Sequence, residues 1–465
     1  MSDLPCGRSG IVSPFRRPTG TETSIEERRS ASGSKTIMSQ SLFITGGRVV
    51  DPSQGIDKIA SLLIVNGKIA EIDIDPSLVP EDASEYDATG KLVLPGLVDM
   101  HVHLREPGYE EAETVATGSF AAIAGGFTSI ACPPNTNPPI DSQANVALIR
   151  ELAARAGHCN VFPMCCISKG RQGEELAELG LLFESGAVAC SDDGSSVMDD
   201  ELMRRALEYC LMFDKTILCH EESAPLAKGG VMHEGRVSNL LGLRGIPAEA
   251  EDVMVQRDIT LAESVGAKLH IMHVSTKGAV EAIRRAKARG VKVTAEVTPH
   301  HLTLTDEELR SFNPNFKMNP PLRSADHVQA CLDGLVDGTI DAIATDHAPH
   351  AAEKKQREID VAPFGVVGLE TALPLMIERL VKSGLLSWSQ LVEKMSLNPS
   401  KILGIPKGTL QKGADADITI VDPDVEWIFE ASKLHSKSVN SPYLGRKATG
   451  RAVATIVGGE IKYQC

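Results

Sequence analysis

The feature that most constrains the fold is a series of eight short apolar runs between residues 96 and 349, separated by segments with helical character. The runs are GLVDMHVHL (96–104), GFTSIACPP (126–134), NVFPMCCIS (160–168), GAVACSDDG (186–194), KTILCHEES (215–223), KLHIMHVST (268–276), VKVTAEVTPHH (291–301) and TIDAIATDHAP (339–349). Parallel strands that helices cover on both faces have this near-continuous apolar character. Eight strand–helix alternations therefore predict an α/β fold, a TIM-like (β/α)8 barrel.

Two segments carry specific helix signals. Residues 279–289 (AVEAIRRAKAR) have apolar residues at helical spacing, and Gly290 follows as a stop signal. Thr305 and Glu308, in TDEE, fit a capping box at the start of a further helix.

The two ends of the chain have a β-rich texture. LFITGGRVV and SLLIVNGKIAEID near the start, and GADADITIVD and ATGRAVATIVGGEIKY near the end, are β-branched runs separated by glycine-containing turns. We predict a small β-sandwich domain built from residues 41–95 and 404–465, and a barrel over residues 96–403. Residues 1–40 lack hydrophobic periodicity and an apolar signal-peptide core, so we expect a disordered extension. Whether residues 1–37 belong to the mature protein is left open.

Composition excludes several classes of function. The net charge of −15 argues against a nucleic-acid surface, and no apolar run is long enough to cross a bilayer. The ten cysteines are scattered and include no CxxC pair, which favours reduced thiols in a cytoplasmic protein.

Potential metal ligands stand at the ends of the apolar runs. His101 and His103 are two residues apart on a predicted strand, so their side chains point to the same side. Four later runs end in further candidates, namely Asp193, His220, His273 and Asp346. This nitrogen and oxygen set suits zinc, and six ligands exceed what one tetrahedral ion needs. The pattern predicts two metal ions that share a bridging carboxylate.

Arg105 lies two residues after His103 and should face the same cavity. A guanidinium beside a cationic metal pair indicates an anionic substrate, because arginine binds carboxylates in a bidentate manner. The alternative from spacing alone is an exposed ion pair with Glu106 or Glu110.

Nine motifs in order resemble the class I dihydroorotases of the amidohydrolase superfamily. They are GLVDMHVHLREPG, AGGFTSIACPPNTNPP, SDDG, ILCHEE, HIMHVST, TPHHL, KMNPPLR, ATDHAPH and APFGVVGLET. The resemblance covers residues 42–465. It implies that one metal is held by His101, His103 and Asp346, and a second by His220 and His273.

The bridging ligand needs a separate argument. Many relatives use a carboxylated lysine at the end of the fourth strand, but Lys169 and Lys215 are the only lysines between His103 and His220 and neither lies there. A carboxylate must serve instead. Asp192 and Asp193 point to opposite sides of an extended chain, and the family spacing favours Asp193.

The resemblance also implies the substrate contacts. Arg105, Asn135 and His350 would bind the carboxylate of dihydroorotate, and Asn319 would contact the pyrimidine ring, with backbone groups near Pro363 and Gly365. Asp346 would be the general acid/base. His270 is expected to pack on the other face of its strand, and His300 and His301 to make supporting hydrogen bonds. The polar segment 351–362 is left open as a lid or a solvated loop.

The implied activity is that of a zinc-dependent hydrolase in de novo pyrimidine biosynthesis. It would interconvert (S)-dihydroorotate and N-carbamoyl-L-aspartate, with a metal-bridging hydroxide attacking the cyclic amide. The alternatives are another cyclic amidase (hydantoinase, dihydropyrimidinase or allantoinase) and a non-catalytic scaffold for aspartate carbamoyltransferase. A homodimer and a complex with that transferase are left open as assemblies.

Overall fold

The computed structural model describes residues 41–465, so the predicted disordered extension over residues 1–40 lies outside the described residues. The fold is α/β, as predicted. Among residues 41–465, no helix combines the length and the apolar character that a bilayer crossing requires.

Seven of the eight predicted runs form parallel strands. These are β8 (Leu97–Asp99), β9 (Phe127–Cys132), β10 (Asn160–Pro163), β11 (Thr216–Cys219), β14 (Lys268–Ile271), β15 (Val293–Val297) and β16 (Ala342–Ile343). They form two parallel sheets with the orders β10-β9-β8 and β11-β14-β15-β16. Two short strands outside these sheets, β12 (Met232–His233) and β13 (Gly245–Ile246), pair with each other.

The fourth run departs from the prediction, because it forms no named strand. Within this run, strand pairing is confined to Cys190. It makes isolated parallel bridges with Cys165 on one side and Ile217 on the other. Val102 makes a further parallel bridge with His347, between the first run and the eighth. Isolated bridges thus join the two parallel sheets on both sides.

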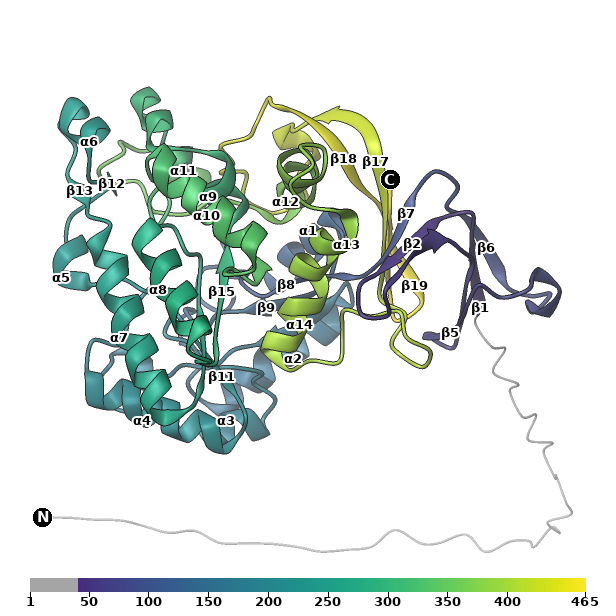
Figure 1. The fold of residues 1–465 in the computed structure, drawn as a ribbon, viewed down its shortest axis with the longest axis horizontal. Helices are drawn as coiled ribbons and strands as arrows, with labels where there is room; N and C mark the ends of the chain where they lie inside the picture. The colour runs from purple at the N-terminus through teal and green to yellow at the C-terminus, as the bar shows by residue number, and fades with distance from the viewer. Residues whose placement is uncertain (1–40) are drawn as a thin grey trace, which may run out of the picture. The chain divides into compact units, whose positions relative to one another are not determined.

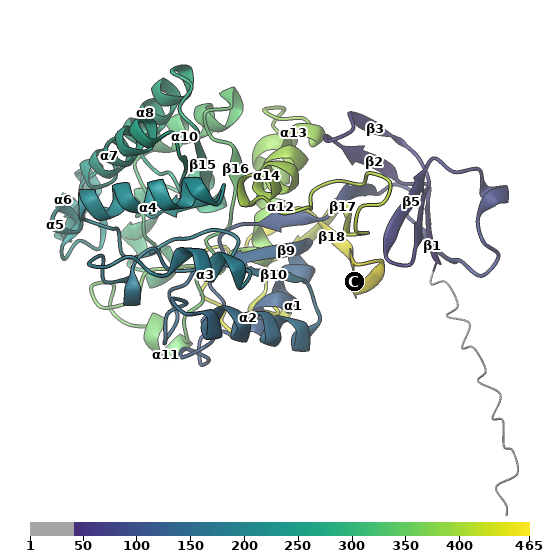
Figure 2. The ribbon, with the colours of Figure 1, turned by 90° about the horizontal axis from the view of Figure 1, so that it is seen from below.

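Helices separate the strands and pack outside them. The longer ones are α1 (Val115–Gly125), α2 (Gln143–Ala156), α4 (Asp200–Met212), α7 (Glu249–Val265), α8 (Lys277–Ala288), α10 (Ala325–Asp337) and α12 (Leu369–Met376). The shorter ones are α3 (Leu179–Glu184), α5 (Ala224–Ala227), α6 (Arg236–Leu241), α9 (Pro299–Thr303), α11 (Ala352–Lys355), α13 (Trp388–Val392) and α14 (Asn398–Leu403). Figures 1 and 2 show α4, α7, α8 and α10 as neighbours around the β11–β15 side.

The two helix signals have different outcomes. The helix predicted from residue 279 begins two residues earlier, because the Thr276 hydroxyl accepts a hydrogen bond from Ala279 N and caps α8. The capping box predicted at Thr305 is wrong. Residues Asp306–Ser311 form a 3-10 helix, and the Thr305 side chain makes no capping bond there.

Strands from both ends of the chain share one sheet, with the order β19-β18-β17-β7-β2-β3. Its members are β2 (Arg48–Asp51), β3 (Ile56–Ile59), β7 (Leu92–Pro95), β17 (Ile418–Ile428), β18 (Lys447–Val457) and β19 (Glu460–Gln464). The contact between the ends is the antiparallel pairing of β7 with β17, visible in Figure 1 where purple and yellow strands meet. A second sheet has the order β5-β4-β1-β6, formed by β1 (Ser41–Thr45), β4 (Leu62–Val65), β5 (Lys68–Ile72) and β6 (Ser84–Asp87).

Candidate metal centre and substrate cavity

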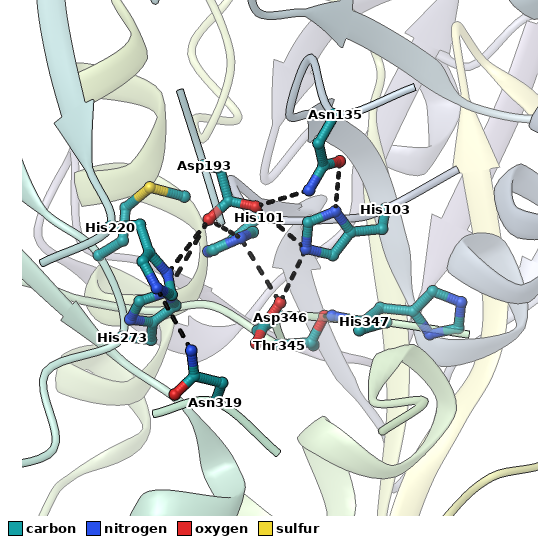
Figure 3. A network of polar contacts seen from close by, with 12 residues as sticks. His101, His103, Asn135, Asp193, His220, His273, Asn319, Thr345, Asp346 and His347 are labelled. Atoms are coloured by element: carbon teal, nitrogen blue, oxygen red, sulfur yellow. Dashed lines mark hydrogen bonds and ion pairs between the residues drawn. The ribbon is translucent and has the colours of Figure 1, made fainter. Parts of the chain in front are cut away.

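The six predicted metal ligands converge on one point (Figure 3). Asp193 lies at the centre: its Oδ1 is 3.6 Å from His101 Nε2, 3.6 Å from His220 Nδ1 and 3.9 Å from His273 Nε2. Its Oδ2 is 3.4 Å from His103 Nε2. All five side chains are buried. Residues from the first, fourth, fifth and sixth runs therefore meet at a single carboxylate.

Asp346, from the eighth run, completes the cluster. Its Oδ1 is 3.0 Å from His103 Nε2 and 3.5 Å from His101 Nε2. Asp192 faces elsewhere: its Oδ1 accepts hydrogen bonds from Ile167 N at 2.8 Å and Ser168 N at 3.2 Å. Of the two neighbouring aspartates, only Asp193 is directed at the histidines.

The backbone at the site is strained at residues that line it. Arg105, His273 and Asp346 have φ angles of 62°, 33° and 47°, in a region that side-chain-bearing residues rarely adopt. Such strain persists only where the surroundings enforce it, and it is concentrated at functional sites. One enforcing contact is Asp99, whose Oδ1 accepts from both His101 N and Thr345 N at 3.1 Å.

Hydrogen bonds fix the two histidines of the first run with their Nε2 atoms toward the carboxylates. His101 Nδ1 donates to Glu296 Oε1 at 2.8 Å, and His103 Nδ1 donates to Asn135 Oδ1 at 2.9 Å. With Nδ1 engaged in this way, the Nε2 atom of each imidazole faces the centre. This is the arrangement in which a second hydrogen bond orients a metal-binding histidine.

Glu296 contacts the cluster through His101 and was missed by the sequence reasoning. It is fully buried on β15, and its Oε2 accepts from His270 Nε2 at 3.2 Å, while Thr294 Oγ1 lies 2.8 Å from His270 Nδ1. Burial alone would raise the pKa of Glu296, but the hydrogen bonds from His101 and His270 lower it to about 2. His270, which was expected to pack on the other face of its strand, is thus joined to His101 through this carboxylate. The sequence signal that could have identified Glu296 was a single glutamate within the apolar run VTAEVTP.

The electrostatics of the cluster favour bound cations. Burial opposes charge on Asp193, yet the imidazoles of His101 and His220 hold its pKa well below the ordinary value. Burial likewise disfavours protonation of His101, but the carboxylates of Asp346 and Asp193 raise its pKa well above normal. The cluster thus attracts positive charge to its centre.

The residues fit a metal ion on two grounds. The buried His101 Nε2, which faces the carboxylates of Asp193 and Asp346, has no hydrogen-bond partner, and an orphaned buried imidazole nitrogen is costly. Two groups of donor atoms could each hold an ion, one made by His101, His103 and Asp193 and the other by Asp193, His220 and His273. Asp193 belongs to both groups.

A cavity of about 390 Å³ opens beside the cluster. All six predicted substrate-binding residues line it, namely Arg105, Asn135, Asn319, His350, Pro363 and Gly365. Five of the six predicted metal ligands line it as well: His103, Asp193, His220, His273 and Asp346. The sixth, His101, is fully buried behind them.

Arg105 lines this cavity and bonds to the backbone beside it. Its Nε donates to Pro349 O at 3.1 Å, and burial lowers its pKa from the ordinary value. The ion pair considered with Glu106 or Glu110 is not formed, because those carboxylates accept from the backbone amides of Val115 and Gly108 instead. The guanidinium is therefore directed to the cavity.

The two asparagines are held by charged neighbours. Asn135 spans His103 and Asp193, donating from its Nδ2 to Asp193 Oδ2 at 3.0 Å. Asn319 donates to Glu222 Oε2 at 2.9 Å, and its Nδ2 is 3.5 Å from His220 Nε2. Both amides thus lie at the edge of the metal cluster as well as in the cavity wall.

His350 and the segment after it are tied together. His350 Nε2 donates to Phe364 O at 2.6 Å, and burial with the nearby Arg105 charge lowers the pKa of His350 to about 3. Asn440, which the sequence reasoning missed, accepts from His350 N and donates to Ala348 O and Gly365 O, each at 3.1 Å. A residue of the chain's C-terminal part therefore holds the cavity wall.

The two adjacent histidines of the seventh run have different surroundings. His301 lies 2.8 Å from Thr298 Oγ1 and 3.0 Å from Pro320 O, the supporting hydrogen bonds expected of it, whereas the buried His300 Nε2 has no partner. The segment 351–362 begins with the short helix α11 and buries Lys355, Ile359 and Ala362.

The chain is similar to known dihydroorotases along almost its whole described length. The profile of the dihydro-orotase-like family matches residues 90–279. A dihydroorotase of Geobacter sp. (strain M21) is 55% identical over 423 residues, which cover 91% of this chain and 99% of the relative. A dihydroorotase of Pelotomaculum thermopropionicum is also 55% identical, over 91% of this chain and 98% of its own.

Solved structures of similar fold carry related names. An L-hydantoinase (dihydropyrimidinase) from Arthrobacter aurescens is 29% identical with a TM-score of 0.82, over 92% of this chain and 96% of its own. A dihydropyrimidinase from Brevibacillus agri is 25% identical with a TM-score of 0.79, over 91% and 95%. With relatives at more than half identity over nearly their full length, the chain belongs to the dihydroorotase family.

Proposed function

We propose that this protein catalyses the reversible hydrolysis of (S)-dihydroorotate to N-carbamoyl-L-aspartate. The observation that carries the proposal is the placement of Arg105 in the same cavity as the histidine–carboxylate cluster. A hydrolytic metal centre suits many cyclic amides, whereas a buried guanidinium beside it selects one that carries a carboxylate.

Two zinc ions are the proposed cofactors. His101, His103 and Asp346 would hold one ion, and His220 and His273 the other, with Asp193 shared between them. The two overlapping donor groups that share Asp193 support this assignment. When bound, such a metal pair supplies an activated water and stabilises the negative charge that develops on the amide oxygen.

The chain's own residues would then bind, orient and transfer a proton. Arg105 binds the substrate carboxylate together with His350, and Asn319 orients the ring. Asp346 accepts the proton of the attacking water and passes it to the ring nitrogen as the amide C–N bond breaks. That nitrogen becomes the terminal ureido nitrogen of the product. The ring-closing direction uses the same steps in reverse.

We also propose the finer architecture, a closed (β/α)8 barrel over residues 96–403 with a β-sandwich built from residues 41–95 and 404–465. The barrel is supported by one apolar cluster with a member from seven of the eight runs: Val98, Ala131, Met164, Ala189, Leu218, Met272 and Ala342. The sandwich is supported by a shared apolar cluster that includes Ile44, Leu62 and Ile64 of one sheet and Val93, Ile418 and Ile456 of the other.

A substrate panel tests the proposed activity. The zinc-loaded protein should hydrolyse dihydroorotate and form it again from N-carbamoyl-aspartate, whereas hydantoin and allantoin should react poorly. Hydrolysis of hydantoin with no turnover of dihydroorotate would assign the protein to the other cyclic amidases. No turnover of any member by metal-loaded, folded protein would favour a scaffold.

A further inference from the structure

Two buried lysines hold the wall of the substrate cavity. Lys355 is 1% exposed, and its Nζ donates to Lys317 O at 2.9 Å and Pro363 O at 2.8 Å. Lys317 is 2% exposed, and its Nζ donates to Ile359 O at 2.6 Å and Asp360 O at 3.2 Å. Neither ammonium forms an ion pair with a carboxylate among residues 41–465.

This arrangement is costly for the fold. Burial lowers the pKa of both lysines, that of Lys355 to about 7 with the neighbouring Lys317 charge contributing. A buried charge without a counter-charge is expensive, and an apolar side chain of similar length would fill the same space at lower cost. Unlike such an apolar side chain, the two lysines donate hydrogen bonds to four backbone carbonyls.

One of those carbonyls, Pro363 O, belongs to a residue of the cavity wall, and two others, Ile359 O and Asp360 O, come just before it in the chain. Pro363, Phe364 and Gly365 are all in the cavity wall. Gly365 N donates back to Lys317 O at 3.0 Å, and Lys317 Nζ lies 4.6 Å from the centre of the Phe364 ring. The two lysines therefore contact the segment 359–365 at several points, from Ile359 O to the ring of Phe364.

The cavity wall formed by Pro363, Phe364 and Gly365 could move little without losing its contacts with Ala348 and His350. Gly365 has a φ of 137°, and a Cβ there would lie 2.8 Å from Ala348 O. Phe364 O is also the acceptor for His350 Nε2. A shift of residues 359–365 would thus displace His350 together with the backbone groups that face the substrate.

We propose that Lys317 and Lys355 are positioning residues for substrate binding, which hold residues 359–365 so that the backbone of Pro363–Gly365 and the ring of His350 meet the substrate. Neither lysine lines the cavity. The inference rests on the proposed function, since the substrate is the one proposed above. It adds the residues that set the shape of the binding wall.

The test replaces each lysine by an apolar side chain of similar length, in Lys355→Met and Lys317→Met. The KM for dihydroorotate should rise about 10- to 100-fold, because small misplacements of binding groups cost that much. The kcat should change less than about threefold and the metal content should not change. Amide hydrogen exchange of residues 359–365, measured without substrate, should become faster.

Lys394→Met is the matched control. Lys394 is also buried and its Nζ donates to a backbone carbonyl, Ile340 O, at 2.6 Å. Ile340 precedes β16, whereas Asp346 and the cavity follow it. This variant should lose stability as the other two do but keep the KM and the exchange rates of the wild-type protein.

The outcomes separate the two proposals. Wild-type protein that does not turn over dihydroorotate refutes the proposed function, and the exchange measurement then still decides whether the lysines hold the segment. An unchanged KM and unchanged exchange in the lysine variants, or an equal rise of KM in Lys394→Met, would overturn the inference. If Lys355→Met does not fold, Lys355→Gln takes its place. Failure of all these variants to fold would also overturn it, since the lysines would then serve folding itself.

Discussion

Asp192 and Asp193 are neighbours in the sequence with opposite surroundings, and this makes them a direct test of the metal assignment. Asp193 contacts four imidazoles, whereas Asp192 accepts from the backbone of Ile167 and Ser168. Asp193→Asn should lower the metal content below two ions per chain. Asp192→Asn should keep the metal and lower the melting temperature. Elemental analysis of both purified variants makes the comparison, and equal metal loss in both would refute the assignment of Asp193.

Glu296 should set the affinity of the site for metal, because it orients His101 and adds negative charge behind it. Glu296→Gln should weaken metal binding about 10- to 100-fold, the usual cost of losing such a supporting contact. Competition with a chelator measures this. Glu370→Gln is the control, since Glu370 Oε2 pairs with His435 Nδ1 at the same 2.8 Å outside the cluster. Equal metal affinity in Glu296→Gln and the wild type would contradict the role.

At the scale of residues, the convergence of the six candidate ligands was predictable and much of their support was not. Polar residues at the ends of apolar runs are visible in the sequence, so His101, His220 and Asp346 could be grouped from the order of residues alone. Glu296 could have been found as an isolated acid within an apolar run. Nothing in the sequence marks Lys317, whose role depends on contacts with residues about 40 positions away.

Asn440 links two elements of the cavity wall, and its removal should affect both. It bonds His350 N, Ala348 O and Gly365 O, and it is buried. Asn440→Ala leaves these backbone groups without a partner, which costs about 1–3 kcal/mol per group left unsatisfied. We expect a lower melting temperature and a higher KM for dihydroorotate.

A second asparagine provides the control for that experiment. Asn398 Nδ2 donates to Asp341 O at 2.9 Å, away from the cavity. Asn398→Ala should lower the melting temperature and leave the KM unchanged. A KM in Asn440→Ala equal to that of the wild type would show that the link does not position the wall.

At the scale of elements, apolar periodicity located the parallel strands but not their lengths. The fourth run has the composition of a strand and yet pairs only at Cys190. The 3-10 helix Asp306–Ser311 was expected as an α-helix, because the residue types at Thr305 and Glu308 suit both. The local sequence therefore predicts where an element begins better than it predicts the hydrogen-bond pattern with which that element continues.

For the whole molecule, buried histidines predict a loss of stability in acid. Burial lowers the pKa of His301 and His233 to about 4 and that of His350 to about 3, with Arg323 and Arg105 adding to the effect at the last two. Below roughly pH 6.5 the unfolded chain takes up protons at these groups and the folded chain does not, so the free energy of unfolding falls as pH falls toward about 4. The melting temperature should decrease across this window.

His233 isolates one contribution to that trend, because it lies outside the substrate cavity and its Nδ1 accepts from Arg323 Nη1 at 3.2 Å. His233→Gln keeps an acceptor there and removes the imidazole. Between roughly pH 6.5 and 4, the melting temperature of this variant should fall by less than that of the wild type. An identical loss in both proteins would show that His233 does not contribute.

The assembly of the chain's two ends was predictable in outline only. Similar β-rich texture at both ends indicated a shared domain, and β7 and β17 do lie in one sheet. Which strands pair could not be derived, because β7 and β17 are more than 300 residues apart and many registers satisfy an alternating pattern. The pairing depends on the folding of the intervening residues 96–403, which brings the ends together.

The central claim is that a metal-dependent amidase selects a carboxylate through Arg105, and one comparison tests it most directly. The kcat/KM of the zinc-loaded protein is measured for dihydroorotate and for dihydrouracil, the same ring without the carboxylate. We predict a preference for dihydroorotate of at least about 10²-fold, which Arg105→Met should largely abolish. Equal or better turnover of dihydrouracil by the wild-type protein, or a preference that survives Arg105→Met, would contradict the claim.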